Sequence, residues 1–186
     1  MDEKNVIALL QWAQLQHDAK YHQDIHHLST QQKFKHFTLH LAKYAGKFAE
    51  LRENDHEQFQ KTLVDTCIIS IALANAFNVN IARRLNIEHA QSLTDVSKSI
   101  ANTQNSEEAR PFPLQLTILV GKLAKNCESL DHLENFPFRE QAESVSLEVF
   151  IATIHEASRK GLDLHEAITK RLTEVEKKYI FHNFLK

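Results

Sequence analysis

The scarcity of glycine and proline is the feature that most restricts what this chain can fold into. Only three glycines and three prolines occur among its 186 residues, where an average composition would supply about 22. A sandwich, a barrel or a doubly wound sheet needs a turn roughly every ten residues, and turns depend on these residue types. The composition therefore predicts an all-α protein.

The charges of the chain nearly cancel, with 22 basic and 24 acidic residues. This balance gives no indication of nucleic acid or an anionic membrane surface as a partner. The longest apolar stretch, residues 67–77, is interrupted by Ser70 and Asn75 and is shorter than the ~20 residues that span a bilayer. Residues 1–5 are mostly charged or polar and no long apolar run follows them, so we expect neither a signal peptide nor a transit peptide. We expect a cytoplasmic protein, with Cys67 and Cys127 as small core residues.

Apolar residues at helical spacing predict about seven to eight helices in a single domain over residues 1–186. Asn78 and Gly161 are placed to end helices in the left-handed conformation. Pro111 and Pro113 close a polar segment that is the best internal boundary. The expected helices cover residues 3–19, 30–54, 57–77, 81–85, a polar helix from Ser92, 114–130, 139–160 and 163–184.

Two parts of the sequence align with each other. Tyr-Ala-Gly-Lys-Phe-Ala at 44–49 aligns with Leu-Val-Gly-Lys-Leu-Ala at 119–124, and eight extra residues in the second part bring Asp65 onto Glu148. The alignment predicts a tandem duplication of a helical hairpin. The first half covers about 29–85, a connector about 86–113, and the second half about 114–165, followed by a C-terminal helix to 186.

Gly46 and Gly121 occupy equivalent positions in this alignment, each in the middle of an expected helix. Glycine in a helix interior costs about 1 kcal/mol relative to alanine. We expect close approach of a neighbouring helix at both positions.

Residues 45–50 (Ala-Gly-Lys-Phe-Ala-Glu) and 64–80 resemble the MazG-like, all-α nucleoside triphosphate pyrophosphohydrolase superfamily. The resemblance is best over residues 36–85 and weaker over 114–165. It implies two helical hairpins that pair into a four-helix bundle, here as a pseudo-dimer within one chain where relatives dimerise. It also implies magnesium held by four acids, in Glu-x-x-Glu and Glu-x-x-Asp motifs on facing helices.

Most of these acids are replaced in this chain. The motif positions are Tyr44, Lys47, Thr62 and Asp65 in the first half, and Leu119, Lys122, Val145 and Glu148 in the second. One acid of four survives in each half, and a lysine at the site repels a divalent cation. We therefore expect a degenerate magnesium site in a catalytically silent protein without a resident cofactor, which binds a nucleotide or a protein partner.

Both halves make the same replacement, which predicts the ion pairs Lys47 with Asp65 and Lys122 with Glu148 as relics of the metal site. In the alternative, both lysines point to solvent. His40, Tyr44, Lys47 and Glu50 share one helix face. We expect a pocket for a phosphate or small anion there, with ordinary packing of Tyr44 beside an exposed Lys47 as the alternative.

Two other functions are kept open. In the first, the chain is an active pyrophosphohydrolase that cleaves a nucleoside triphosphate to the monophosphate and pyrophosphate, with magnesium held by acids outside the motif. Those acids are Glu50, Glu53, Asp65, Glu140 and Glu143. In the second, weaker one, histidines bind a metal, because His22 and His26, and His36 and His40, are four residues apart. Solvated or capping histidines are the preferred interpretation.

The end of the last expected helix, residues 179–185, carries more apolar surface than a free C-terminus usually exposes. This composition predicts packing on the N-terminal helix or on another subunit, and so a homodimer or a protein partner.

Overall fold

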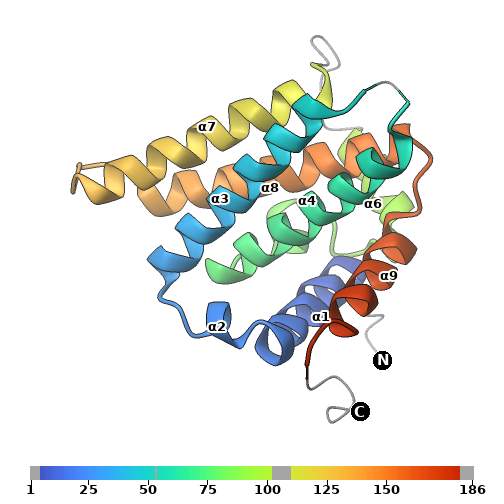
Figure 1. The fold of residues 1–186 in the computed structure, drawn as a ribbon, viewed down its shortest axis with the longest axis horizontal. Helices are drawn as coiled ribbons and strands as arrows, with labels where there is room; N and C mark the ends of the chain where they lie inside the picture. The colour runs from blue at the N-terminus through green and yellow to red at the C-terminus, as the bar shows by residue number, and fades with distance from the viewer. Residues whose placement is uncertain (1–4, 53, 102–109, 181–186) are drawn as a thin grey trace.

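The structure is a computed structural model that describes residues 5–52, 54–101 and 110–180. Within these ranges it contains nine helices and no strand, so the all-α prediction is confirmed (Figure 1). The helices are α1 (Val6–Tyr21), α2 (Gln23–His26), α3 (Thr30–Glu50), α4 (His56–Ala76), α5 (Ile81–Arg84), α6 (Leu93–Ala101), α7 (Phe112–Asp131), α8 (Phe138–Arg159) and α9 (Leu164–Glu176). None of the described helices is both long and apolar enough to cross a lipid bilayer.

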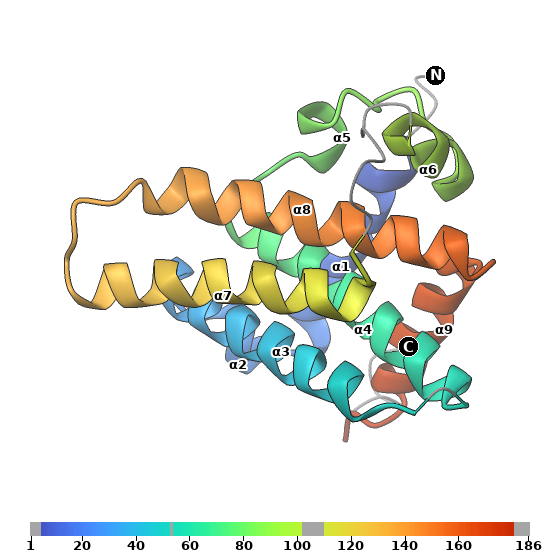
Figure 2. The ribbon, with the colours of Figure 1, turned by 90° about the horizontal axis from the view of Figure 1, so that it is seen from above.

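The centre of the molecule is a bundle of the four long helices α3, α4, α7 and α8. Each of α3 and α8 packs against both α4 and α7, and the pairs α3–α4 and α7–α8 are antiparallel hairpins (Figures 1 and 2). Apolar residues three or four apart turn one stripe of each helix toward the shared core. Phe34, Leu41, Leu63, Leu123 and Phe150 are completely buried there.

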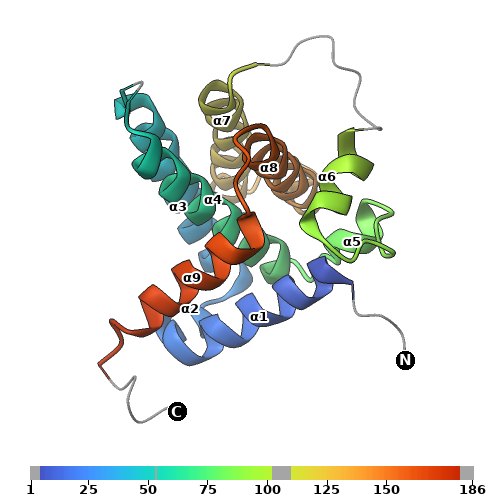
Figure 3. The same cartoon turned by 90° about the vertical axis from the view of Figure 1, so that its right-hand side faces the viewer.

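Helices α1 and α9 pack across α4 on one side of this bundle. They lie next to each other in Figure 3, and their C-terminal ends meet where the rings of Tyr21 and Tyr179 stack edge to face, with centroids 5.6 Å apart. The C-terminal segment thus packs on the N-terminal helix at Tyr179. The predicted extent of the last helix is wrong, because α9 ends at Glu176; residues 181–186 lie outside the described part of the chain.

The start of α1 is hydrogen-bonded to the loop between α5 and α6. The Asn5 side-chain amide donates hydrogen bonds to the carbonyl oxygens of Ile87 (2.7 Å) and Ala90 (3.1 Å), while its oxygen caps α1. Further along α1, the Gln11 amide donates to the carbonyl oxygen of Val79 at 2.7 Å. These bonds fix the position of α1 relative to the end of α4.

Local signals account for several helix ends. Ser29 forms a capping box with Gln32, and Ser92 and Asp95 exchange hydrogen bonds at the start of α6. Asn78 (φ 57°) and Gly161 (φ 63°) have the predicted left-handed conformation. The short helix α2 was not predicted, since its four residues carry no apolar period.

The close helix approach expected at Gly46 and Gly121 is wrong. Both glycines are exposed, and a Cβ atom built on either would meet nothing within 4 Å. No neighbouring helix requires these glycines.

The two cysteines belong to the interior, as predicted. Cys67 is completely buried, and burial raises the pKa of its thiol to about 12. Cys127 is half-buried, with its sulfur 3.7 Å from Thr38 Oγ1. Neither thiol has the lowered pKa of a reactive cysteine.

Candidate functional site

A cavity of about 470 Å³ lies between α1, α3, α4 and α9, with residues of α2 at one end. Three of the four residues on the predicted face of α3, His40, Tyr44 and Lys47, line this cavity together with Asp65 of α4. They meet because residues three and four apart share a helix face, and α4 packs against that face. Glu50, at the end of α3, is exposed to solvent and does not line the cavity. Glu53 lies outside the described residues.

The α3 wall carries a row of basic groups. The rings of His36 and His40 are 4.5 Å apart between centroids. Lys43 Nζ lies 4.6 Å, and Lys47 Nζ 5.8 Å, from the centroid of the Tyr44 ring. The tyrosine is buried. The two lysines, about one helical turn apart, therefore both form cation–π contacts with its ring beside the cavity.

His40 is neutral at physiological pH. Its pKa is lowered to about 4, mainly by burial and then by the positive charges of Lys43 and His36. Lys43 Nζ lies 3.3 Å from His40 Nδ1. An ammonium group only donates, so Nδ1 is the acceptor of this hydrogen bond and the proton of the neutral ring is on Nε2.

Asp65 forms its ion pair with Arg171 of α9. The guanidinium group donates from Nε to Oδ1 (2.6 Å) and from Nη2 to Oδ2 (3.2 Å), with the two side chains 19% and 12% exposed for Arg171 and Asp65. The hydrogen bond to Asp65 raises the pKa of Arg171. The predicted pairing of Lys47 with Asp65 is therefore wrong, because the bidentate arginine takes both carboxylate oxygens. Lys47 forms no ion pair with any described carboxylate.

The corresponding pair of the second hairpin has a different setting. Lys122 Nζ donates to Glu148 Oε2 at 3.0 Å, as expected from the sequence, but the two side chains are 49% and 40% exposed. The neighbouring motif positions Leu119 and Val145 are buried apolar residues. Lys122 and Glu148 thus form a surface ion pair.

The acids proposed for an active pyrophosphohydrolase are not brought together among the described residues. Asp65 is the one that lines the cavity. Glu140 is exposed at the start of α8, and Glu143 accepts hydrogen bonds from Arg139 (2.7 Å) and Arg84 (3.4 Å). Two further aspartates, Asp18 and Asp24, line the other end of the cavity.

The α1 wall contains two residues, His17 and Asp18, that spacing along the sequence does not single out. His17 is almost completely buried and faces the cavity with Asp18 and His22. The signal was present, because Val6, Leu10, Gln14 and His17 continue one buried helical stripe into polar residues. The sequence marks Arg171 in a similar way, because it interrupts an otherwise apolar helical stripe formed by Leu164, Ile168 and Val175. His26 does not line the cavity, so the predicted grouping of His22 with His26 is replaced by that of His22 with His17.

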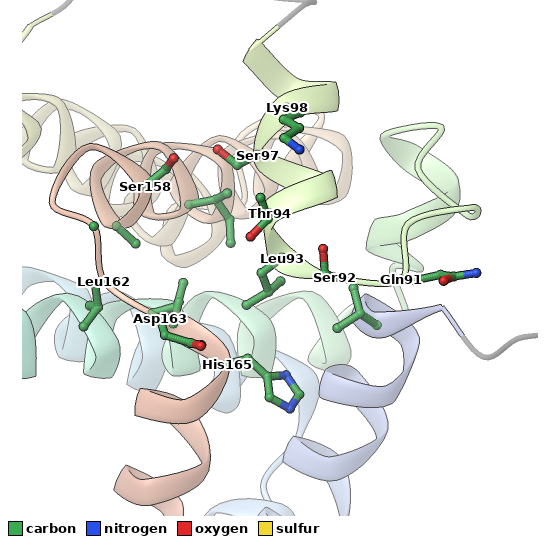
Figure 4. A pocket seen from close by; sticks show the side chains of 15 residues that line it. Gln91, Ser92, Leu93, Thr94, Ser97, Lys98, Ser158, Leu162, Asp163 and His165 are labelled. Atoms are coloured by element: carbon green, nitrogen blue, oxygen red, sulfur yellow. The ribbon is translucent and has the colours of Figure 1, made fainter.

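A second cavity, of about 630 Å³, lies between α1, α6, the end of α8 and the start of α9. Its walls are mostly hydroxyl and apolar side chains, and Ser97 and Ser158 point toward each other across it (Figure 4). Asp163 is used as the N-cap of α9, where it accepts from the Glu166 backbone N–H at 3.0 Å. This cavity has fewer ionisable groups than the first one, so the chemistry gathers in the cavity between α1, α3, α4 and α9.

Comparison of the chain with protein-family models, curated proteins and solved structures finds no match. The chain is an all-α protein to which no family is assigned.

Proposed function

We propose that the chain binds a phosphate-bearing small molecule in the cavity between α1, α3, α4 and α9, and does not hydrolyse it. The observation that carries this proposal is the pair of lysines beside Tyr44. Lys43 and Lys47 both reach the cavity, and neither is paired with a described carboxylate. Two ammonium groups on one wall attract an anion with several oxygens, such as a phosphate chain.

The charge distribution in the cavity supports an anion at the lysine end. The pKa of Lys43 is lowered by partial burial and by the positive charge of Lys47. A bound anion would relieve this repulsion. Asp65 would oppose the anion, but its charge is compensated by Arg171 at 2.6 Å.

The remaining walls suit the rest of a nucleotide. Phe37, Ile68, Ile69, Leu172 and Val175 give the cavity an apolar side. Ligand cavities typically range from about 300 to 1,000 Å³ and combine apolar walls with a few polar groups. The resemblance to the MazG-like superfamily makes a nucleotide our preferred ligand within the phosphate-bearing class.

We expect no hydrolysis because the carboxylates at the cavity do not form a magnesium site. Magnesium requires a cage of several oxygen ligands, while Asp65 has both oxygens bound to Arg171. Lys47, on the α3 wall of the same cavity, adds a positive charge that repels a divalent cation. A protein that binds a nucleotide without cleaving it fits a regulatory or sensing role.

We further propose that the two antiparallel hairpins derive from a tandem duplication. The arrangement of α3–α4 and α7–α8 in one bundle supports a pseudo-dimer within a single chain. A homodimer or a protein partner that uses the C-terminal segment remains part of this proposal.

Titration calorimetry with nucleoside mono-, di- and triphosphates and with pyrophosphate tests the proposal. The double variant Lys43→Ala/Lys47→Ala should bind the preferred ligand at least tenfold more weakly than the wild type. Lys122→Ala is the matched control, since it removes a lysine of the second hairpin that does not line the cavity, and its affinity should equal that of the wild type. Equal affinity of the double variant would contradict the proposed site.

Pyrophosphate release with magnesium or manganese tests the silent character separately. We expect no turnover of any nucleoside triphosphate. Turnover that Asp65→Ala abolishes would establish the enzyme alternative in its place.

A further inference from the structure

The α1 end of the same cavity contains a buried histidine without a hydrogen-bond partner. The His17 side chain is 5% exposed, and neither Nδ1 nor Nε2 has a partner. Buried polar groups in folded proteins nearly always have one. Because the residue lines the cavity, the unpartnered ring indicates a ligand that an imidazole nitrogen would bind.

Two more ligand atoms lie beside this ring. His17, Asp18 and His22 each offer one atom within 4.8 Å of the other two, and His17 Nδ1 is 3.8 Å from Asp18 Oδ1. Ligands of a tetrahedral zinc ion, each 2.0–2.1 Å from the metal, lie roughly 3.3 Å apart. The three atoms must therefore move closer together when a metal binds, and the half-buried side chains of Asp18 and His22 are less constrained than that of the buried His17.

We propose that His17, Asp18 and His22 bind a divalent transition metal, with zinc as the best match. Two imidazoles and one carboxylate suit zinc and its neighbours, whereas magnesium and calcium prefer oxygen ligands alone. Three protein ligands leave one position of a tetrahedral zinc site to a ligand from outside the chain.

The surroundings of the three residues hold them in place. Gln14 Nε2 donates to Asp18 Oδ1 at 2.8 Å, and the His22 backbone N–H donates to the Asp18 carbonyl oxygen at 3.0 Å. The Tyr21 ring lies 5.0 Å from the His17 ring between centroids. Hydrogen bonds of this kind orient ligands and tune their affinity for a metal.

The site differs from the histidine pairs expected from sequence spacing. It uses residues at positions 17, 18 and 22, at the end of α1 and the turn that follows. No other group of three histidine, cysteine or acidic ligands is this close together among the residues that the structure describes. The three residues lie close together because the chain turns at the end of α1, and spacing along one helix does not predict this grouping.

Titration of the metal-free full chain with zinc chloride tests this proposal. We expect one zinc ion per chain in calorimetry, and a tetrahedral cobalt spectrum when cobalt replaces zinc. His22→Ala and Asp18→Asn should each weaken zinc binding at least tenfold. His17→Gln should do the same, but it alters a buried residue, so the two less buried positions carry the test independently of folding.

His26→Ala is the matched control, because it removes a nearby histidine that does not line the cavity. Zinc affinity equal to the wild type in His22→Ala, or equally weakened in His22→Ala and His26→Ala, would overturn the proposal. Lys43→Ala/Lys47→Ala should retain zinc binding, and phosphate binding should be measurable in the presence of a chelator. Each site can thus fail without the other.

Discussion

The hairpins α3–α4 and α7–α8 have similar lengths and lie in one bundle, but their charged positions have different surroundings. Asp65 on α4 is covered by α9 and held by a bidentate arginine, while Glu148 on α8 pairs with Lys122 at the surface. The difference comes from the outer helices, because α1 and α9 pack on α4. Helix α6 packs on α8 but leaves Lys122 and Glu148 at the surface, whereas α1 and α9 enclose Asp65 in a cavity with several ionisable side chains.

The largest effect is expected when the two ion pairs are broken. Asp65→Ala removes the two close hydrogen bonds of the largely buried Arg171 and leaves it only the longer contact to Glu174 (3.5 Å), so we expect a loss of about 3 kcal/mol in the free energy of unfolding. Glu148→Ala should cost less than about 1 kcal/mol, since its pair is exposed. Urea denaturation of both variants measures the difference.

Arg171→Leu combined with Asp65→Ala is the control for this comparison. Replacing both partners removes the uncompensated charge, and the double variant should recover much of the lost stability. Equal losses for Asp65→Ala and Glu148→Ala would show that the covering helices do not matter.

A smaller effect is expected from pH, through His40. Its folded pKa of about 4 lies below the unfolded value of about 6.5, so the unfolded chain takes up the proton first. The stabilising effect of the neutral ring is complete above pH 6.5 and is lost as the pH falls toward 4. We expect His40 alone to lower the free energy of unfolding by roughly 1 to 2 kcal/mol between pH 6.5 and 4, after allowing for its partial exposure.

His40→Gln introduces the residue that the alignment places at the same position of the second hairpin, Gln115. The variant should show a shallower decline in the free energy of unfolding between pH 6.5 and 4. The same slope in His40→Gln and the wild type would contradict the burial of a neutral ring.

The smallest effect is expected from the helical glycines, and it should be the same in both hairpins. Gly46→Ala and Gly121→Ala add a methyl group where nothing lies within 4 Å, so each should stabilise the chain by about 0.5 to 1 kcal/mol. Gly161→Ala should destabilise it, because residue 161 has φ 63°. Thermal denaturation of the three variants distinguishes these signs, and destabilisation by only one of the helical substitutions would indicate an unequal environment.

The sequence predicts the longer helices well because each of them carries its own apolar period and, in several cases, its own cap. It fails where information is not local. The apolar pattern predicts that the last helix ends near residue 184, whereas α9 ends at Glu176, because apolar residues near a chain end do not specify a helix by themselves. The interpretation of Gly46 failed since a mid-helix glycine need not have a packing reason.

The candidate site is predicted only in part, because some of its contacts join residues that are far apart in the sequence. His40, Tyr44 and Lys47 share a face of one helix, so spacing alone brings them together. Arg171 is 106 residues away from Asp65, and its contact depends on how α9 crosses α4. Spacing along a single helix cannot provide that crossing, although the interruption of an apolar stripe by a polar residue marks where to look.

The wide separation of Asp65 and Arg171 also has a consequence for biosynthesis. At roughly 5 to 20 residues per second, the 106 positions between them take on the order of 5 to 20 seconds to translate. During this interval Asp65 has no arginine partner, and one wall of the cavity does not yet exist. A ligand can therefore recognise the chain at this cavity only after the ribosome has made α9.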